Sequence, residues 1–208
     1  MSLHGLLSVT IGVPNVAETA AYYTDFGLTP GEGGWFSTAD AGQQLRLLPA
    51  PVRRLLELRV GADDPDDLAR AAAGLARLGV PSALTGTHLE AAEPVTGVRV
   101  ALDVAPRTRQ GAIPATPYNG PGRLDRPDTR APGFTRPDRV RPRKLGHAVL
   151  GSTDYAASTA FFTEGLGFKI SDRLKGRGGV HALLHRPSQR AGPGRAGQLP
   201  APHVLAGR

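Results

Sequence analysis

The sequence contains no cysteine, and after Asp172 it contains no acidic residue. Without cysteine the chain can form neither a disulfide bond nor a thiolate metal site, which agrees with a cytoplasmic location. No run of about 18 apolar residues occurs, and no charged-then-apolar leader is present, so neither a transmembrane helix nor a secretory signal is predicted. We therefore expect a cytoplasmic protein without a membrane partner.

The formal net charge of +7 raises the question of a nucleic-acid partner, and its distribution argues against one. Seven of the 25 basic residues follow Asp172, which leaves 18 basic against 18 acidic residues in the preceding part of the chain. A nucleic-acid interface usually combines a basic surface with stacking aromatic residues, and this basic tail has no aromatic residue. We expect no nucleic-acid partner.

The chain repeats itself at an offset of 139 residues. In this alignment Gly12 corresponds to Gly151, Asn15 to Asp154, and the segment YYTD (22–25) to FFTE (161–164). Each copy reads as a short apolar strand that turns at the glycine and is followed by a helix. Asn15 and Asp154 are the expected N-caps, because their side-chain oxygens can accept a free backbone N–H.

Helical periodicity indicates which residues of each predicted helix face the core. Glu18 is a capping-box partner for Asn15, and Val16, Ala20 and Tyr23 fall on one face of the first helix. Tyr155 and Phe162 share a face in the second copy. We interpret these aromatic residues as core.

Between the copies, further strands are predicted at 34–38, 44–48, 54–60, 84–90 and 97–104, with a second helix over 66–78. The acidic run DDPDD (63–67) before this helix is interpreted as an N-terminal cap, not as a cation site. Residues 1–105 thus give two successive units of strand, helix and several strands. The predicted fold class is α+β, built from paired βαβββ modules.

The next segment differs in composition. Residues 106–143 hold 8 prolines and 9 arginines, which predicts an extended linker lying over the surface of the preceding domain. A third, partial module is expected at 144–178, and residues 179–208 form an aberrant tail that we expect to be disordered. Only the N-terminal pair of modules is complete.

These features resemble the vicinal oxygen chelate superfamily, which includes glyoxalases, bleomycin-resistance proteins and dioxygenases. The order of the repeat, the linker, the GH of a new strand (146–147) and the motif STD…FFTEGLGF (152–168) is most similar to two-domain extradiol catechol dioxygenases. The resemblance implies a metal-free N-terminal domain and a C-terminal domain that holds Fe(II). It also implies a small catechol-type substrate, while a homo-oligomer remains an open alternative.

In that family two histidines and one carboxylate bind one face of the iron, and catechol and dioxygen take the open positions. By the resemblance, His147 stands at the first-histidine position and is the one candidate metal ligand; no catalytic or cofactor-binding residue is assigned. The alternative for His147 is a strand histidine bonded to a backbone carbonyl. In the N-terminal domain the corresponding positions offer Ser8, Arg53 or Arg54, and Arg99 or Ala101, none of which suits iron.

The other ligands are expected beyond Phe168, where the chain becomes rich in Arg, Pro, Gly and Ala. Two motif matches there are interpreted as accidental. His181 and His185 lack a zincin glutamate and precede Pro187, and GPGRAG (192–197) has no preceding strand. A reading-frame slip near Gly178 or Gly179 accounts better for this composition: with free choice of third bases, a one-base shift permits a sequence ending in LHHTSW.

One ligand of three cannot hold Fe(II) by chelation, so we expect this chain to bind no iron and to be inactive as given. We also expect the third module to pack loosely or to borrow the N-terminal domain for its apolar face. Two alternatives stay open. One is a non-catalytic small-molecule binding protein, whose cup Trp35 and Phe36 line if they are not core. The other is a glyoxalase-like or epimerase-like metalloenzyme.

Overall fold

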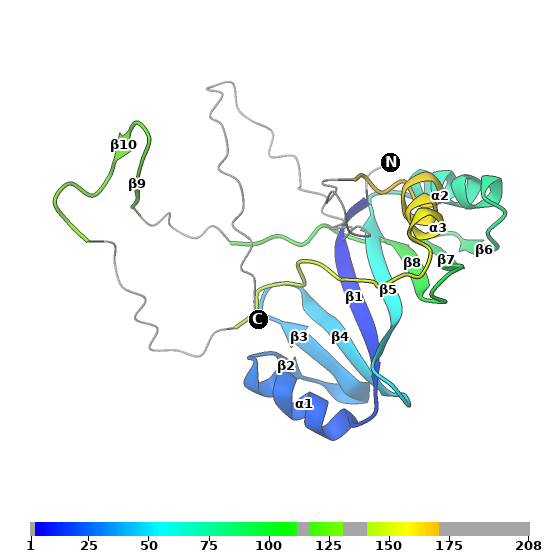
Figure 1. Cartoon of the computed structure of the whole chain (residues 1–208), viewed down its shortest axis with the longest axis horizontal. Helices are drawn as coiled ribbons and strands as arrows, with labels where there is room; N and C mark the ends of the chain where they lie inside the picture. The colour runs from blue at the N-terminus through cyan, green and yellow to red at the C-terminus, as the bar shows by residue number, and fades with distance from the viewer. Residues whose placement is uncertain (1–2, 112–116, 131–140, 171–208) are drawn as a thin grey trace.

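The computed structural model describes residues 3–111, 117–130 and 141–170 (Figure 1). An eight-stranded sheet dominates this part of the chain, with strand order β2-β3-β4-β1-β5-β8-β7-β6. The strands are β1 (Leu3–Val13), β2 (Thr29–Pro30), β3 (Trp35–Thr38), β4 (Gly42–Pro49), β5 (Arg54–Ala62), β6 (Ser82–Thr85), β7 (His88–Ala92) and β8 (Arg99–Val104).

The pairing pattern reveals two matching halves. β1 pairs in parallel with β4, and β5 pairs in parallel with β8, whereas β1 and β5 join the halves as antiparallel neighbours. Helix α1 (Val16–Asp25) follows β1, and helix α2 (Pro65–Arg77) follows β5 at the same place in its half. The predicted α+β class and the two βαβββ units are therefore confirmed.

The helices begin where the sequence predicted. Asn15 Oδ1 accepts the backbone N–H of Glu18 at 3.0 Å, and the Asn15 side-chain amide donates to the Glu18 carboxylate at 3.1 Å. Asp64 caps α2 by accepting the N–H of Asp67 at 2.9 Å, so the acidic run does act as a helix cap. Asp154 accepts the N–H of Ala157 at 3.0 Å and starts α3 (Tyr155–Ala160).

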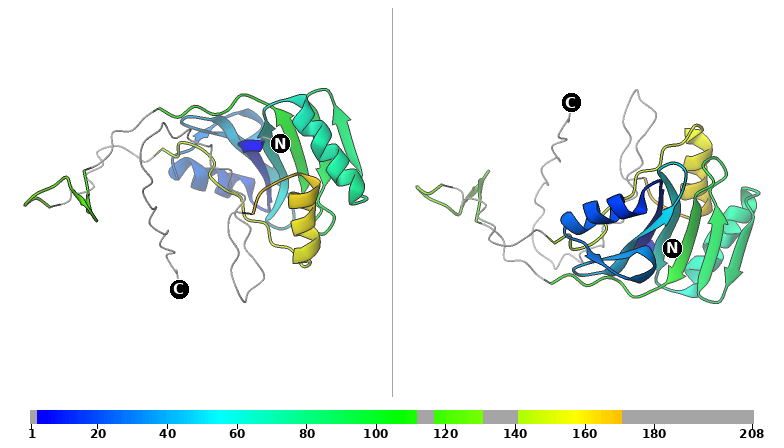
Figure 2. Two further views of the ribbon diagram at one scale, coloured as in Figure 1. Left: turned by 90° about the horizontal axis from the view of Figure 1, so that it is seen from above. Right: turned by 90° about the horizontal axis from the view of Figure 1, so that it is seen from below.

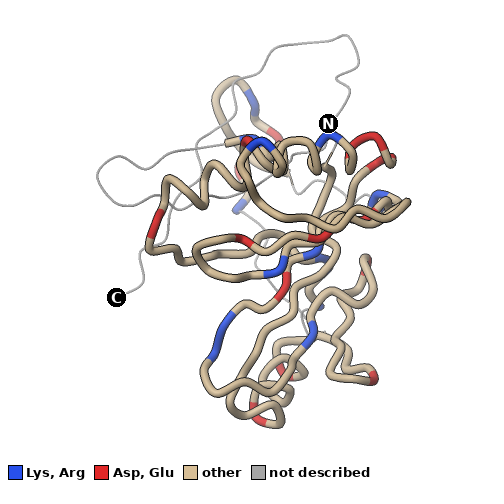
Figure 3. Tube along the Cα trace, turned by 90° about the vertical axis from the view of Figure 1, so that its right-hand side faces the viewer, with Lys and Arg blue, Asp and Glu red and all other residues tan. Residues whose placement is uncertain are grey.

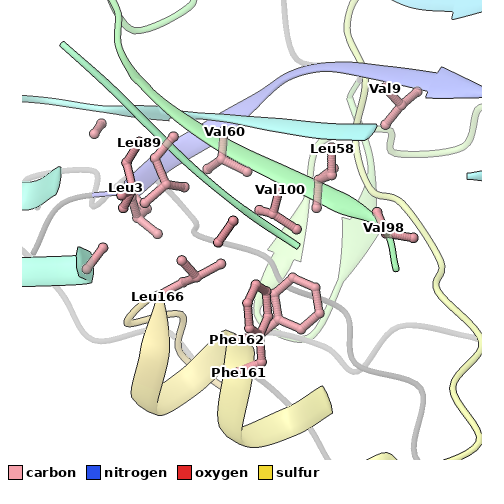
Figure 4. Packing of buried hydrophobic residues seen from close by; sticks show 14 of the residues in the cluster. Leu3, Val9, Leu58, Val60, Leu89, Val98, Val100, Phe161, Phe162 and Leu166 are labelled. Carbon is pink, nitrogen blue, oxygen red and sulfur yellow. The ribbon is translucent and has the colours of Figure 1, made fainter. Parts of the chain in front are cut away.

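One face of the sheet carries the apolar core. Strand register places Val9, Leu45, Leu58 and Val100 side by side across four strands, and all four are buried. Leu68 and Leu75 of α2 pack in the same cluster. Phe161, Phe162 and Leu166, from the π-helical turn η2 (Phe161–Gly165) and the residue after it, complete the cluster from below (Figure 4).

The third-module segment thus packs onto the N-terminal sheet. Phe161 and Leu166 are each only 1% exposed. The segment of α3 and η2 lies beside α2 (Figure 2), and the contact is so close that a Cβ on Gly74 would overlap the Gly165 carbonyl. Of the two packing expectations for this segment, the structure shows the second: it uses the N-terminal domain to cover its apolar face.

The described parts of the 106–143 segment run along the sheet domain and project from it (Figure 1). Arg107 forms an ion pair with Asp63, and Arg143 forms one with Asp40, each at 2.5 Å. A small hairpin of β9 (Asn119–Gly120) and β10 (Arg123–Leu124) interrupts the extended course. Over the described chain as a whole, basic and acidic residues are scattered along the trace (Figure 3).

Three local predictions were wrong. Residues 84–90 do not form one strand, because a turn at Gly86–Thr87 divides them between β6 and β7. Tyr155 is 36% exposed and does not share the buried environment of Phe162. Residues 144–150 form no strand in the part of the chain that is described, because none of these residues has a ladder partner there and a strand persists only when its backbone groups are paired.

No helix in the described ranges combines the length and the apolar character that crossing a bilayer demands.

Candidate functional site

The sheet face opposite the core carries Ser8 and Ala101, two of the residues that the sequence analysis compared with family metal ligands. Ser8 on β1 lies beside Arg59 on β5, and Arg59 lies beside Ala101 on β8. Arg54 instead pairs with Gly12 at the end of β5, and Arg53 precedes the strand. Neither Arg53 nor Arg54, the residues that the sequence offered for the second ligand position, therefore lies beside Ser8, and β-bulges shift the register between β1 and β5.

This polar face is crossed by a ladder of ion pairs. Arg59 binds Asp103 through two hydrogen bonds of 3.0 and 2.9 Å, and His88 Nδ1 lies 2.8 Å from the same carboxylate. Arg99 pairs with Glu57 at 2.8 Å. We call these five side chains, together with Glu90 beside His88, the charged ladder. Every member has a partner, so the ladder stabilises the sheet face and presents no unsatisfied group to a ligand.

Within the ladder, the pKa values of Asp103 and Arg59 both shift in the direction that favours the charged form of each partner. Burial by itself raises the pKa of Asp103, but the hydrogen bonds from Arg59 and His88 outweigh it and hold that pKa below its usual value. The hydrogen bonds that Arg59 donates to Asp103 likewise raise the pKa of the Arg59 guanidinium. A carboxylate held this way by an arginine is a poor metal ligand, because binding a cation there would require breaking the bidentate pair.

His147, the one predicted ligand, lies on the other side of the sheet. It is exposed, and it stands in the extended segment 141–150 that passes over the core face next to α1. Leu145 anchors this segment, because its backbone N–H donates to Gln44 Oε1 at 2.6 Å. Ser8 and His147 match in the repeat, but Ser8 is buried at 4% exposure on the polar face.

A cavity of about 530 Å³ opens beside His147. Its apolar walls come from the first half of the sheet and from α1, and segment 142–149 closes one side. Three further basic residues, Arg53, Arg54 and Lys144, also line it, and none of its lining residues is acidic. Such a cavity suits a ligand that has an apolar body and a negatively charged end.

The residues around His147 do not fit Fe(II). The neighbouring ionisable side chains are arginines and a lysine, which supply no metal ligand and repel a cation. Throughout the described ranges, no group of three His, Cys, Asp or Glu residues is arranged to hold a metal ion. His181 and His185 and the GPGRAG segment lie outside the described residues.

The aromatic candidates for a cup divide between two roles. Phe36 is 3% exposed and packs against Tyr23 with ring centroids 6.1 Å apart, so it belongs to the core as expected. Trp35 points to the polar face, where the Arg46 guanidinium lies 5.5 Å from its ring centroid. A cation over an aromatic ring is a stable pair, so the Arg46 guanidinium already covers part of the Trp35 ring surface that a ligand would contact.

Two features escaped sequence reasoning. The charged ladder had a signal, since charged residues recur with period two at Glu57 and Arg59, and at His88 and Glu90. Glu93 had none: its side chain is completely buried in the β7–β8 turn, and it accepts hydrogen bonds from Thr96 and from Ser158 of α3. Only the tertiary structure brings α3 to that turn.

Comparison with known proteins agrees with this architecture. Residues 144–205 match the family model described as "Glyoxalase/Bleomycin resistance protein/Dioxygenase superfamily". The matched range runs past residue 178, where the sequence predicted the third module to end. No curated protein matches the chain.

Solved structures share the fold. The Mn(II)-bound glyoxalase from Novosphingobium aromaticivorans is 25% identical, with a TM-score of 0.56 over 83% of this chain and 55% of that one. The 2,2',3-trihydroxybiphenyl 1,2-dioxygenase from the dibenzofuran-degrading Sphingomonas wittichii strain RW1 is 21% identical (TM-score 0.55; 83% and 60% covered). The 2,3-dioxygenase LapB from Pseudomonas sp. KL28 is 19% identical (TM-score 0.57; 83% and 62% covered).

The fold defines a protein of paired βαβββ modules. The family-model match covers residues 144–205, and what the chain as a whole shares with these solved structures is the fold. The chain spans less than two thirds of the length of these solved relatives.

Proposed function

We propose that this chain derives from an extradiol ring-cleavage dioxygenase and that, as given, it cleaves no catechol. In this proposal residues 1–105 are a metal-free N-terminal domain and residues 144–178 begin the metal-binding domain. The supporting observation is the surroundings of His147, which combine an exposed imidazole with arginine and lysine neighbours and no second ligand. The dioxygenases among the solved relatives support the choice of lineage.

No iron-dependent reaction step is assigned to this chain, because its described residues do not fit the metal. The N-terminal ladder is equally unsuited, since its carboxylate Asp103 is already bound by Arg59 through two hydrogen bonds. A catechol would therefore find no Lewis acid on either face of the sheet as the described residues stand. Inactivity is the chemical consequence.

The proposal retains the reading-frame slip near Gly178 or Gly179 as the origin of the missing ligands. A restored frame would supply the second histidine in the segment LHHTSW, and the third module would gain the strands that its first segment needs as partners. His147 would then move from its exposed course into a paired strand.

A glyoxalase-like metalloenzyme is the second candidate, favoured by the Mn(II)-bound glyoxalase among the solved relatives. Such an enzyme needs histidine and glutamate ligands, and the described residues around His147 supply no second ligand. Catechol turnover by the frame-restored protein separates the two candidates, because a glyoxalase acts on a different class of substrate.

The test begins with resequencing of the gene across the codons for residues 175–181. The chain as given and a frame-restored version are then loaded anaerobically with Fe(II), and bound iron and ring-cleavage product are measured. We expect iron and turnover only in the restored protein, lost in His147→Ala and kept in His88→Ala on the opposite sheet face. Stoichiometric iron and catechol cleavage by the chain as given would overturn the proposal.

A further inference from the structure

The cavity beside α1 is a built pocket, formed by elements that lie far apart in the sequence. β1, β4 and β5 form its floor, the end of α1 and the following turn form one wall, and residues 142–149 form the opposite wall. Its volume of about 530 Å³ falls within the range of small-molecule sites in proteins, about 300–1,000 Å³. Two backbone hydrogen bonds, from Ala39 to Pro142 and from Asp40 to Arg143, hold the second wall in place at 2.9 Å each.

The interior of the pocket is apolar. Val9, Leu28 and Leu45 line it and are between 5% and 8% exposed, and Ile11 and Leu55 extend the same surface. Removing an apolar ligand surface from water against such walls contributes roughly 25 cal/mol per Å². A ligand with a hydrophobic ring system or chain is therefore favoured over a sugar-like or highly polar one.

The mouth of the pocket is positively charged. Arg53, Arg54, Lys144 and His147 all line the pocket and are all exposed, which places them where it opens to solvent. The Arg53 guanidinium donates to the Tyr23 hydroxyl at 3.2 Å. Within the described ranges, Arg54 and Lys144 make no ion pair, and no acidic residue lines the pocket to neutralise them.

We propose that this pocket binds a small amphipathic monocarboxylate, with its apolar body among Val9, Leu45 and Leu55 and its carboxylate at Arg54 and Lys144. The positive charge at the mouth favours a carboxylate ligand over the chain's own C-terminal segment as the occupant of the pocket. That segment carries seven basic and no acidic residues after Asp172, so the basic mouth repels it. This site lies on the helix-covered face and needs no metal, so it does not depend on the proposed catalytic lineage.

The test uses the full chain without added metal and three probes: 2-naphthoate, its neutral analogue 2-naphthalenemethanol, and 2-naphthylmethylammonium. Affinities are measured by isothermal titration calorimetry at low and high salt. We expect the acid to bind about tenfold or more tightly than the alcohol, the ammonium to bind weakest, and added salt to reduce only the preference for the acid.

The double variant Arg54→Gln/Lys144→Gln is expected to lower the affinity for 2-naphthoate about three- to tenfold and to leave that for the alcohol unchanged. Arg77→Gln, at the end of α2 and outside the pocket, is the matched control for loss of positive charge. Ala148→Phe fills the pocket and should reduce binding of both molecules. Circular dichroism confirms that each variant is folded. Equal affinity for acid and alcohol, or no effect of the double variant, would overturn the proposal.

Discussion

At the scale of single residues, Glu93 is a completely buried ionisable group that several hydrogen bonds hold in place. Its carboxylate is completely buried, yet its surroundings contain only hydrogen-bond donors: the Thr96 N–H at 2.6 Å, the Thr96 hydroxyl at 2.5 Å and the Ser158 hydroxyl at 2.8 Å. Burial by itself raises the pKa of Glu93, and these hydrogen bonds, with one from the Val95 backbone, outweigh it and lower that pKa below the ordinary value. Glu93 therefore links the β7–β8 turn to α3 in its charged form.

The sign of the resulting pH dependence is fixed by this lowered pKa. A group whose pKa is lower in the folded than in the unfolded state contributes its full stability above the unfolded pKa, about 4.3, and loses it as the pH falls through the folded value. We expect Glu93→Gln to cost about 1–3 kcal/mol of unfolding free energy at pH 7, because the amide places donors where acceptors are needed.

Urea denaturation of the wild type and Glu93→Gln from pH 7 to pH 3 measures this contribution. The difference between the two proteins should shrink below pH 4.3 or so as Glu93 becomes protonated. Glu32→Gln, an exposed substitution with the same charge change, should show little difference at any pH. A Glu93→Gln effect that is constant over the whole range would contradict a charged carboxylate at this site.

At the scale of elements, the contact between α2 and η2 depends on the absence of a side chain at Gly74. Alanine normally stabilises a helix interior by about 1 kcal/mol relative to glycine. At position 74, however, a Cβ would overlap the Gly165 carbonyl oxygen and lie 2.7 Å from the Glu164 oxygen. Because both obstacles are backbone atoms, the helix and the turn would have to separate.

We therefore expect Gly74→Ala to destabilise the protein by about 1–3 kcal/mol, the opposite sign to helix propensity. Thermal unfolding measures the change, and hydrogen exchange locates it in residues 155–166. Gly86→Ala is the matched control, since a Cβ there meets no atom within 4 Å. A Gly74→Ala variant as stable as the wild type would show that η2 does not pack against α2 in solution.

Elements with local signals were predictable, and those that depend on distant partners were not. Asn15, Asp64 and Asp154 start their helices because capping needs only residues three positions away. The β6–β7 turn was missed because Gly86 alone interrupts an otherwise continuous strand pattern. Segment 144–150 ends in a short apolar run that reads as a strand, yet it pairs with no strand in the described part of the chain. The same limit applies to the site, since the repeat marks His147 but does not show that arginine and lysine surround it.

At the scale of the whole molecule, the N-terminal sheet and the third-module segment share one core. Phe161 and Leu166 are each 1% exposed within the same cluster as Leu58, Val60 and Val100 of the sheet. Elements that bury their apolar surface in one another unfold together. The described part of the chain should accordingly behave as one cooperative unit, although the sequence divides it at the 106–143 linker.

The single tryptophan offers a direct test of this coupling, because Trp35 lies in β3, in the half of the sheet away from α2 and η2. Replacing Phe161 by alanine removes a fully buried ring, which typically costs about 3–5 kcal/mol. If the core is shared, Phe161→Ala must shift the urea transition reported by Trp35 fluorescence, and circular dichroism must report the same midpoint. Val149→Ala, in the same segment but 67% exposed, should leave that transition in place. If Phe161→Ala leaves the midpoint of the Trp35 fluorescence transition unchanged, the third-module segment is only tethered to the sheet. The N-terminal pair of modules is then stable without it.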